Sequence, residues 1–99
     1  MTRIELAPEV LDDFDRFFEH LMQFEVTDAA ARIGEIVDAL QILAHSPCIG
    51  RLLAGGKREL VIGRDARGYV ALYRYVSTVD TVVVLAIRNQ RESGYPHGG

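Results

Sequence analysis

Residues 58–95, RELVIGRDARGYVALYRYVSTVDTVVVLAIRNQRESGY, contain three apolar runs separated by two polar segments. The runs Leu60–Ile62, Tyr69–Val76 and Thr81–Ile87 are rich in valine, isoleucine and tyrosine, residue types that favour β-strands. The segments between them contain the glycine, aspartate and serine residues that are typical of turns. This alternation predicts an antiparallel meander of three strands at the centre of the fold.

The first of two predicted helices should begin at Pro8, because proline suits the first turn of a helix. From Val10 onward, apolar residues recur at the three-residue and four-residue spacing of one helix face. This stripe includes Phe14, Phe17 and Phe18, and we expect their rings in the hydrophobic core.

The second predicted helix has an apolar stripe of the same spacing and runs from Thr27, its expected N-cap, to Ala44. Ser46 and Pro47 should end it. Because few residues separate the two stripes, the helices should form an antiparallel hairpin laid on one face of the sheet.

A further short strand is predicted at Thr2–Leu6, where apolar and polar residues alternate. Parallel pairing with Thr81–Ile87 is available to it, because the intervening chain is long enough for a crossover. Residues 1–99 then form a single α+β domain, consisting of an N-terminal strand, a two-helix hairpin and a three-stranded antiparallel meander. We expect residues 96–99 to be a flexible tail.

Both long strands of the meander are apolar on both faces. Strict alternation places Tyr69, Ala71, Tyr73 and Tyr75 on one face of their strand, opposite Val70, Leu72, Arg74 and Val76. In the last strand it places Val82, Val84, Ala86 and Arg88 together, opposite Val83, Leu85 and Ile87. The helices need one face of the sheet, so the other should be covered by the C-terminal residues of the chain or by a partner.

Charge is divided unevenly along the chain. The formal net charge is −3, but residues 1–46 carry ten acids against three arginines, and residues 47–99 carry four acids against eight arginines and lysines. The two parts therefore have net charges of −7 and +4. Two readings are open: the cationic part faces a polyanion or an acidic partner, or its arginines simply line the rim of the sheet.

Several features of the sequence bear on secretion, membrane insertion and cofactor binding. The sequence has one cysteine, no apolar run of the roughly 18 residues that a membrane span needs, and a start that lacks the regions of a signal peptide. We therefore expect a soluble cytoplasmic protein. His20, His45 and His97 lack metal-ligand spacing, and Gly50–Lys57 does not match a phosphate-binding loop, so we predict neither a metal nor a cofactor.

Three motifs of the meander resemble those of the RelE/ParE toxin superfamily, the toxins of type II toxin–antitoxin modules, long described as plasmid stabilisation proteins. They are R-E-L at residues 58–60, G-Y-x-x-x-Y-R at residues 68–74 and R-x-Q-R-E-x-G-Y at residues 88–95. The resemblance covers essentially the whole chain. It implies an antiparallel sheet with two helices on one side, and a cognate antitoxin, encoded by an adjacent gene, that binds the toxin in a hetero-oligomer.

The superfamily contains two activities. RelE-like members cleave messenger RNA on the ribosome, whereas ParE-like members inhibit DNA gyrase. In the ribonuclease pattern the second residue after the meander glycine is commonly arginine, and here it is Val70. The residue after Arg88 is often histidine or arginine, and here it is Asn89, which cannot act as an acid or base. The resemblance therefore favours a gyrase inhibitor of the ParE type.

Two alternatives stay open beside this reading. The chain is a ribosome-dependent mRNA endoribonuclease, in which Tyr95 and Arg88 would be the catalytic residues, or it is a non-toxic remnant with the same fold. Whether the protein is an enzyme is thus undecided at the level of sequence. For either target, gyrase or ribosome-bound message, the candidate binding residues are Arg58, Arg64, Arg67, Arg74, Arg88, Arg91 and Tyr95.

Overall fold

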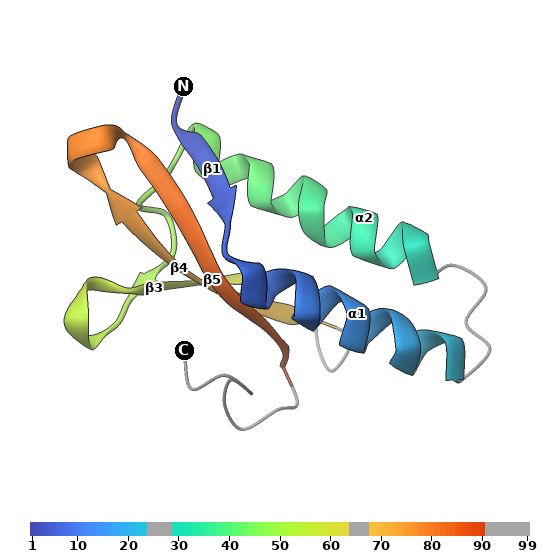
Figure 1. The fold of residues 1–99 in the computed structure, drawn as a ribbon. Helices are drawn as coiled ribbons and strands as arrows, with labels where there is room; N and C mark the ends of the chain where they lie inside the picture. Colours follow the sequence, from blue (N-terminus) through green and yellow to red (C-terminus); the bar gives the residue numbers. More distant parts are fainter. Residues whose placement is uncertain (24–28, 64–67, 91–99) are drawn as a thin grey trace.

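The computed structural model describes residues 1–23, 29–63 and 68–90, in which two α-helices lie on one face of a five-stranded sheet (Figure 1). This arrangement confirms the predicted α+β class. In chain order the elements are β1 (Arg3–Leu6), α1 (Pro8–Gln23), α2 (Ala29–Leu40), a 3₁₀ turn (Gln41–Ala44), β2 (Arg51–Leu52), a 3₁₀ turn (Ala54–Gly56), β3 (Arg58–Ile62), β4 (Tyr69–Val76), a 3₁₀ turn (Ser77–Val79) and β5 (Thr81–Asn89).

The strand order in the sheet is β1-β5-β4-β3-β2. Strand β1 pairs in parallel with β5, with Arg3 opposite Thr81 and Leu6 opposite Val84, which is the pairing that the sequence made available. The other neighbouring strands are antiparallel. Strand β2 was not predicted, because two residues are too few to show a period of two.

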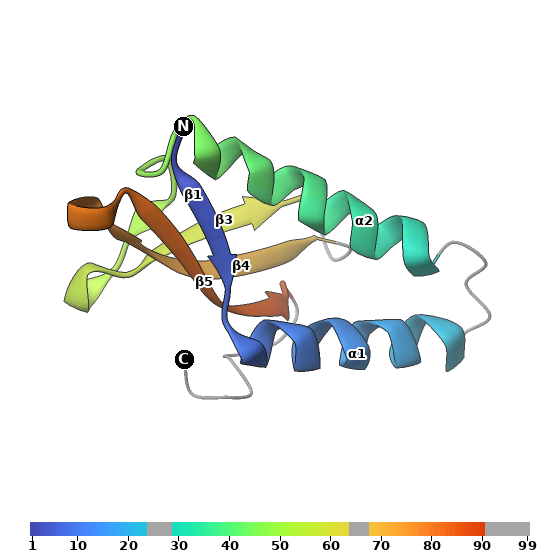
Figure 2. The same ribbon diagram turned by 45° about the horizontal axis from the view of Figure 1, so that its top comes forward.

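The hydrophobic core lies between the sheet and the two helices, which run side by side over it (Figure 2). Of the phenylalanines predicted to be buried, Phe17 is buried and contacts Tyr69 with ring centroids 4.9 Å apart, and Phe14 is partly buried. The prediction is wrong for Phe18, which is 41% exposed. Thr27, the expected cap of the second helix, lies outside the described residues.

Strand β5 does not alternate strictly. Leu72 on β4 pairs with Ala86, but the next residue, Tyr73, pairs with Val84, so Leu85 is an extra residue that forms a β-bulge. As a result Ile87 joins Val82 and Val84 in the core. The predicted grouping of Arg88 with Val82 and Val84 is therefore wrong.

Helix α1 continues the edge of the sheet where β1 ends. The last paired residue of β1 is opposite Val84, so the backbone of Ile87 lacks a strand partner on that side. The buried carboxylate of Asp13 accepts a hydrogen bond from the Ile87 amide (2.9 Å), and the Arg16 guanidinium donates to the Ile87 carbonyl (3.3 Å). Two helical side chains thus replace a strand and fix α1 against the region just after the bulge.

Asp80 ties the turn between β4 and β5 to the start of the chain. Its carboxylate accepts hydrogen bonds from the hydroxyls of Thr2 and Tyr75, each at 2.7 Å. Both hydrogen bonds lower the pKa of Asp80, and the bond from Thr2 has the larger effect. The hydrogen bond from Tyr75 to Asp80 raises the pKa of Tyr75. Asp80 has a φ of 45°, a left-handed conformation that aspartate and asparagine tolerate better than most residues.

None of the described helices is long and apolar enough to cross a membrane.

Candidate functional site

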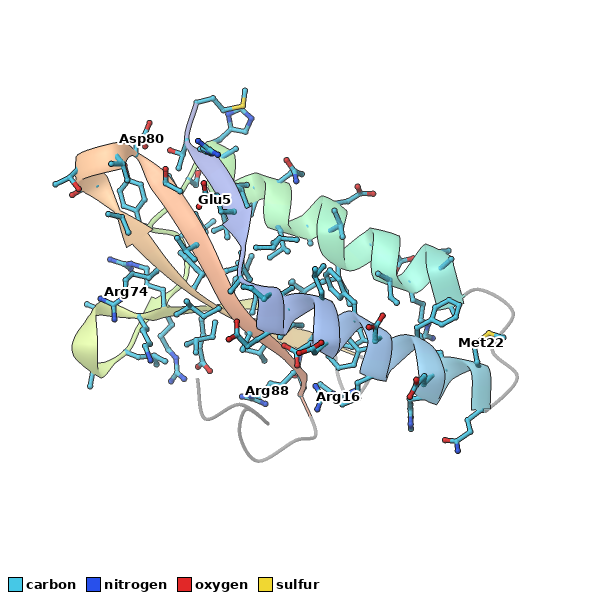
Figure 3. The ribbon with its side chains drawn as sticks, in the orientation of Figure 1. Glu5, Arg16, Met22, Arg74, Asp80 and Arg88 are labelled. Carbon is cyan, nitrogen blue, oxygen red and sulfur yellow. The ribbon has the colours of Figure 1, made fainter. Side chains whose placement is uncertain are left out.

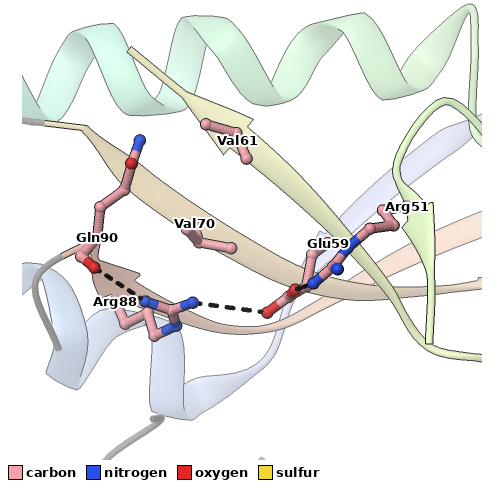
Figure 4. Close-up of a pocket in the computed structure, with 6 residues that line it drawn as sticks. All are labelled: Arg51, Glu59, Val61, Val70, Arg88 and Gln90. Carbon is pink, nitrogen blue, oxygen red and sulfur yellow. Dashed lines mark hydrogen bonds and ion pairs between the residues drawn. The ribbon is translucent and has the colours of Figure 1, made fainter. Parts of the chain in front are cut away.

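We call the face of the sheet away from the helices the outer face. It contains a hollow of about 290 Å³, the outer-face hollow. Its lining residues come from β3, β4 and β5, from the short edge strand β2 and from the residue after β5 (Figure 4). They are Arg51, Glu59, Val61, Val70, Arg88 and Gln90.

Strand register brings these residues together. Val70 on β4 pairs with Val61 on one side and with Arg88 on the other, so the three side chains form a row across the outer face. Arg51 on β2 pairs with Glu59 on β3, at the next position on this face. The bulge in β5 is essential to this arrangement, because without it Arg88 would share the helix-covered face with Val84.

Glu59 lies between two arginines of the hollow. Its Oε1 atom is 2.8 Å from Nη2 of Arg51, and its Oε2 atom is 3.9 Å from Nη2 of Arg88. The Glu59 and Arg88 side chains are only 11% and 19% exposed, whereas that of Arg51 is 77% exposed. Arg88 also donates through Nη1 to the backbone carbonyls of Asn89 (3.2 Å) and Gln90 (3.5 Å). These three ionised side chains of the hollow thus sum to one positive charge, held by contacts within the protein.

The floor of the hollow is apolar. Val70 is 5% exposed, and its neighbours Leu72 and Ala86 on the outer face are buried, while Val61 is exposed. The expectation that the C-terminal residues or a partner cover this face stays a prediction, because residues 91–99 lie outside the described part of the chain. The hollow therefore combines an apolar floor with charged ends.

The predicted target-binding arginines are only partly brought together. Arg88 lines the hollow, and Arg74 lies exposed on the outer face near the other end of β4, as Figure 3 shows. Arg58 pairs with Tyr73, so it points to the side of the sheet that the helices cover. The predicted residues Arg64, Arg67, Arg91 and Tyr95 lie outside the described residues.

Arg58 has contacts that organise the connector before β3. Its Nη1 atom donates to the carbonyls of Cys48 (3.1 Å) and Gly50 (2.9 Å). The Gly50 amide in turn donates to the buried Tyr73 hydroxyl (2.8 Å), and burial raises the pKa of that hydroxyl. A Cβ atom on Gly50 would lie 2.7 Å from the Tyr73 ring and hydroxyl and 2.8 Å from the Glu59 carbonyl. The close approach of the connector backbone to Tyr73 and Glu59 therefore requires glycine at position 50.

Sequence reasoning missed Arg51, Glu59 and Gln90 as members of the site. Glu59 belongs to the R-E-L motif, and its alternation with Val61 was a visible sign that both face the same way. Arg51 gave no such sign, since its position depends on the unpredicted strand β2. The sequence alone does not reveal that an acid separates the arginines.

The described lining of the hollow contains few groups that could transfer a proton. Within the described lining of the hollow there is no histidine, lysine or tyrosine, and its one carboxylate is paired with arginines. Among the residues that the structure describes, no group of three or more histidine, cysteine or acidic side chains could hold a metal ion. Charge and shape are thus the means of recognition that this surface offers.

Comparison with known proteins gives concordant matches. A family model described as the ParE toxin of the type II toxin–antitoxin system parDE matches residues 4–94. Toxin RelE3 of Caulobacter vibrioides is 30% identical over 92 residues, which cover 93% of this chain and 98% of that toxin.

Solved structures share the fold at lower identity. A chain of the chromosomal ParDE toxin–antitoxin system from P. aeruginosa has a TM-score of 0.74 at 19% identity, over 90% of this chain and 96% of that one. A chain of the intact E. coli RelBE toxin–antitoxin complex has a TM-score of 0.62 at 12% identity, over 93% of this chain and 100% of that one. These matches agree with the observed order of strands and helices.

Proposed function

Because the chain belongs to the ParE toxin family of type II toxin–antitoxin systems, we propose that it stops growth by binding and inhibiting DNA gyrase, in the ParE manner. The observation that carries the proposal is the composition of the outer-face hollow. Val70 forms its floor where the ribonuclease pattern has an arginine, and Asn89 follows Arg88 where that pattern has a histidine or arginine. A toxin that acts by binding does not need either group.

The proposal includes a cognate antitoxin, encoded by an adjacent gene, that neutralises the toxin in a hetero-oligomer. The similar solved structures come from toxin–antitoxin complexes, which supports this partner. Co-expression with the neighbouring gene should restore growth and yield a stable complex. A monomer that ignores the product of this gene would contradict the assignment.

A second candidate function is cleavage of ribosome-bound messenger RNA in the RelE manner. The resemblance to Toxin RelE3 and the presence of Arg88 in the hollow favour it. Tyr95 and Arg88 would then be the catalytic residues, with the arginine stabilising the charge that develops on the phosphorus centre. A non-toxic remnant is the third reading, and absence of growth arrest on induction would select it.

One experiment separates the two toxic mechanisms. The toxin is induced in cells, the ends of messages on ribosomes are mapped, and supercoiling by purified gyrase is measured with added toxin. We expect loss of supercoiling, no codon-phased message ends, and only a modest effect of Tyr95→Phe. Codon-phased cleavage that Tyr95→Phe abolishes, with supercoiling unaffected, would overturn the proposal.

The cationic outer face supplies a second test. Arg74 is exposed on this face, so Arg74→Ala should weaken gyrase inhibition while leaving the fold intact, since exposed charges contribute little to stability. Arg32→Ala removes the same charge from α2, on the other side of the sheet, and serves as the matched control. Equal inhibition by the two variants would show that the charge of this face is not used for target binding.

A further inference from the structure

We propose that Glu59 is the specificity determinant of the outer-face hollow: its carboxylate occupies the anion position between Arg51 and Arg88 and so excludes the phosphate groups of nucleic acid. The inference goes beyond the proposed function, because it concerns what the hollow rejects and holds for any cellular target. It is tested without gyrase or ribosomes, so its failure would be distinct from failure of the gyrase proposal.

The geometry points to an internal ligand. Glu59 directs one carboxylate oxygen to each arginine, at 2.8 Å from Arg51 and at 3.9 Å from Arg88, and both contacts lie inside the hollow (Figure 4). Guanidinium groups bind carboxylates and phosphates with the same planar arrangement of donors. Arg51 donates a hydrogen bond to Glu59, and Arg88 faces it as an ion-pair partner. Both guanidinium groups are therefore of the kind that would otherwise bind a phosphate.

The surroundings make the exclusion effective. Glu59 and Arg88 are each less than one-fifth exposed, and the neighbouring floor is the buried side chain of Val70. Charges in such a setting are screened less by water and salt than charges on an open surface. A phosphate entering the hollow would meet the negative charge of Glu59 at close range as well as the two arginines.

The alternative is that Glu59 only stabilises the pairing of β2 with β3, through its ion pair with Arg51. That role needs the contact with Arg51 alone, because Arg51 is on β2 and Arg88 is on β5. It predicts that loss of the Glu59 charge changes stability without creating an anion site. The two roles of Glu59 therefore predict different affinities of a Glu59 variant for an anion.

The test compares Glu59→Gln with Glu5→Gln in the full chain. Glu5 on β1 pairs with Val83 on β5, and Val83 pairs with Arg74 on β4, so Glu5 lies on the outer face. The Glu5 side chain is exposed and forms an ion pair with Arg3 at 3.0 Å. The two substitutions make the same change in net charge. Binding of a short fluorescein-labelled single-stranded RNA is followed by fluorescence anisotropy over a range of salt concentrations, and folding is checked by circular dichroism.

We expect Glu59→Gln to bind the RNA roughly tenfold more tightly than the wild type, as for a hydrogen bond gained to a charged group. The slope of log affinity against log salt should steepen by about one. Glu5→Gln should change the affinity by less than about twofold, because an exposed pair is weakly coupled to the hollow. Adding Arg88→Gln to Glu59→Gln should remove the gain.

Equal effects of Glu59→Gln and Glu5→Gln would show a general charge effect and overturn the inference. A gain that survives Arg88→Gln would also overturn it, because the anion would then bind elsewhere. If Glu59→Gln does not fold, Glu59→Met, which keeps the volume and removes the charge, takes its place. Failure of both variants to fold would make Glu59 a structural residue and likewise contradict the proposal.

Discussion

Replacing the buried Asp13 of α1 by alanine should destabilise the fold far more than replacing the adjacent, exposed Asp12. Asp13 is 1% exposed, and its Oδ2 atom accepts the Ile87 amide at 2.9 Å. Its Oδ1 atom is 3.6 Å from Nη2 of Arg16. The alanine variant would leave the amide of a fully buried strand residue without this acceptor, at the place where β1 no longer covers the edge of β5.

The magnitude follows from these contacts. An unsatisfied buried amide costs about 1–3 kcal/mol. The Arg16 side chain is 37% exposed, so the loss of its ion pair adds only about 0.2–1 kcal/mol. We therefore expect Asp13→Ala to lower the free energy of unfolding by about 3 kcal/mol, a large share of the roughly 5–15 kcal/mol typical of a small domain. Asp13→Asn keeps an oxygen for the Ile87 amide and should cost about 1 kcal/mol.

Equilibrium unfolding in urea measures the difference. With a denaturant slope of about 1–3 kcal/mol/M, the midpoint of Asp13→Ala should fall by about 1–3 M while the slope stays unchanged. Asp12→Ala is the matched control, because Asp12 is the adjacent exposed acid and should stay within about 0.5 kcal/mol of the wild type. If the midpoints of the two alanine variants coincide, the Ile87 contact is not a determinant of stability and the reasoning is refuted.

Two further predictions concern the connector and the β4–β5 turn. Gly50→Ala should lower the free energy of unfolding in urea by about 1–3 kcal/mol, because its Cβ would clash with Tyr73. Gly34→Ala, which has open space around it in α2, should raise the free energy of unfolding by up to about 1 kcal/mol. A Gly50 variant as stable as the Gly34 variant would contradict the close packing. Because its folded pKa is lowered, Asp80 contributes stability that is present above its ordinary pKa of 3.8 and is lost as pH falls through the folded value. Asp80→Asn, which retains the left-handed conformation, should therefore reduce the loss of stability on acidification in unfolding curves recorded from about pH 6 to pH 2; an unchanged pH dependence would rule out this role.

Local sequence patterns were sufficient for most of the architecture. The apolar spacing after Val10 specified α1, and the β-branched runs specified β4 and β5, because helix and strand periods are properties of consecutive residues. The turn chemistry between these strands specified the meander. The sequence by itself was therefore sufficient to identify the α+β class and the ordered motifs of a RelE/ParE toxin.

The same patterns also assigned the outer face partly correctly. Arg74 was placed with Val70 and Leu72, and strict alternation holds along β4, which contains no extra residue. Phe18 is on the apolar stripe of α1, but its ring is exposed. A stripe gives the direction of a helix face but does not give the width of the surface that covers it.

Only the tertiary structure decided the composition of the site. The bulge at Leu85 moved Arg88 to the outer face, and the two-residue strand β2 placed Arg51 beside Glu59. Neither event has a signature in the sequence, because the pairing of one strand with another depends on packing between residues that are distant along the chain. An acid thus lies between two arginines of the hollow because register, which is a property of strand pairs, determines which charges become neighbours.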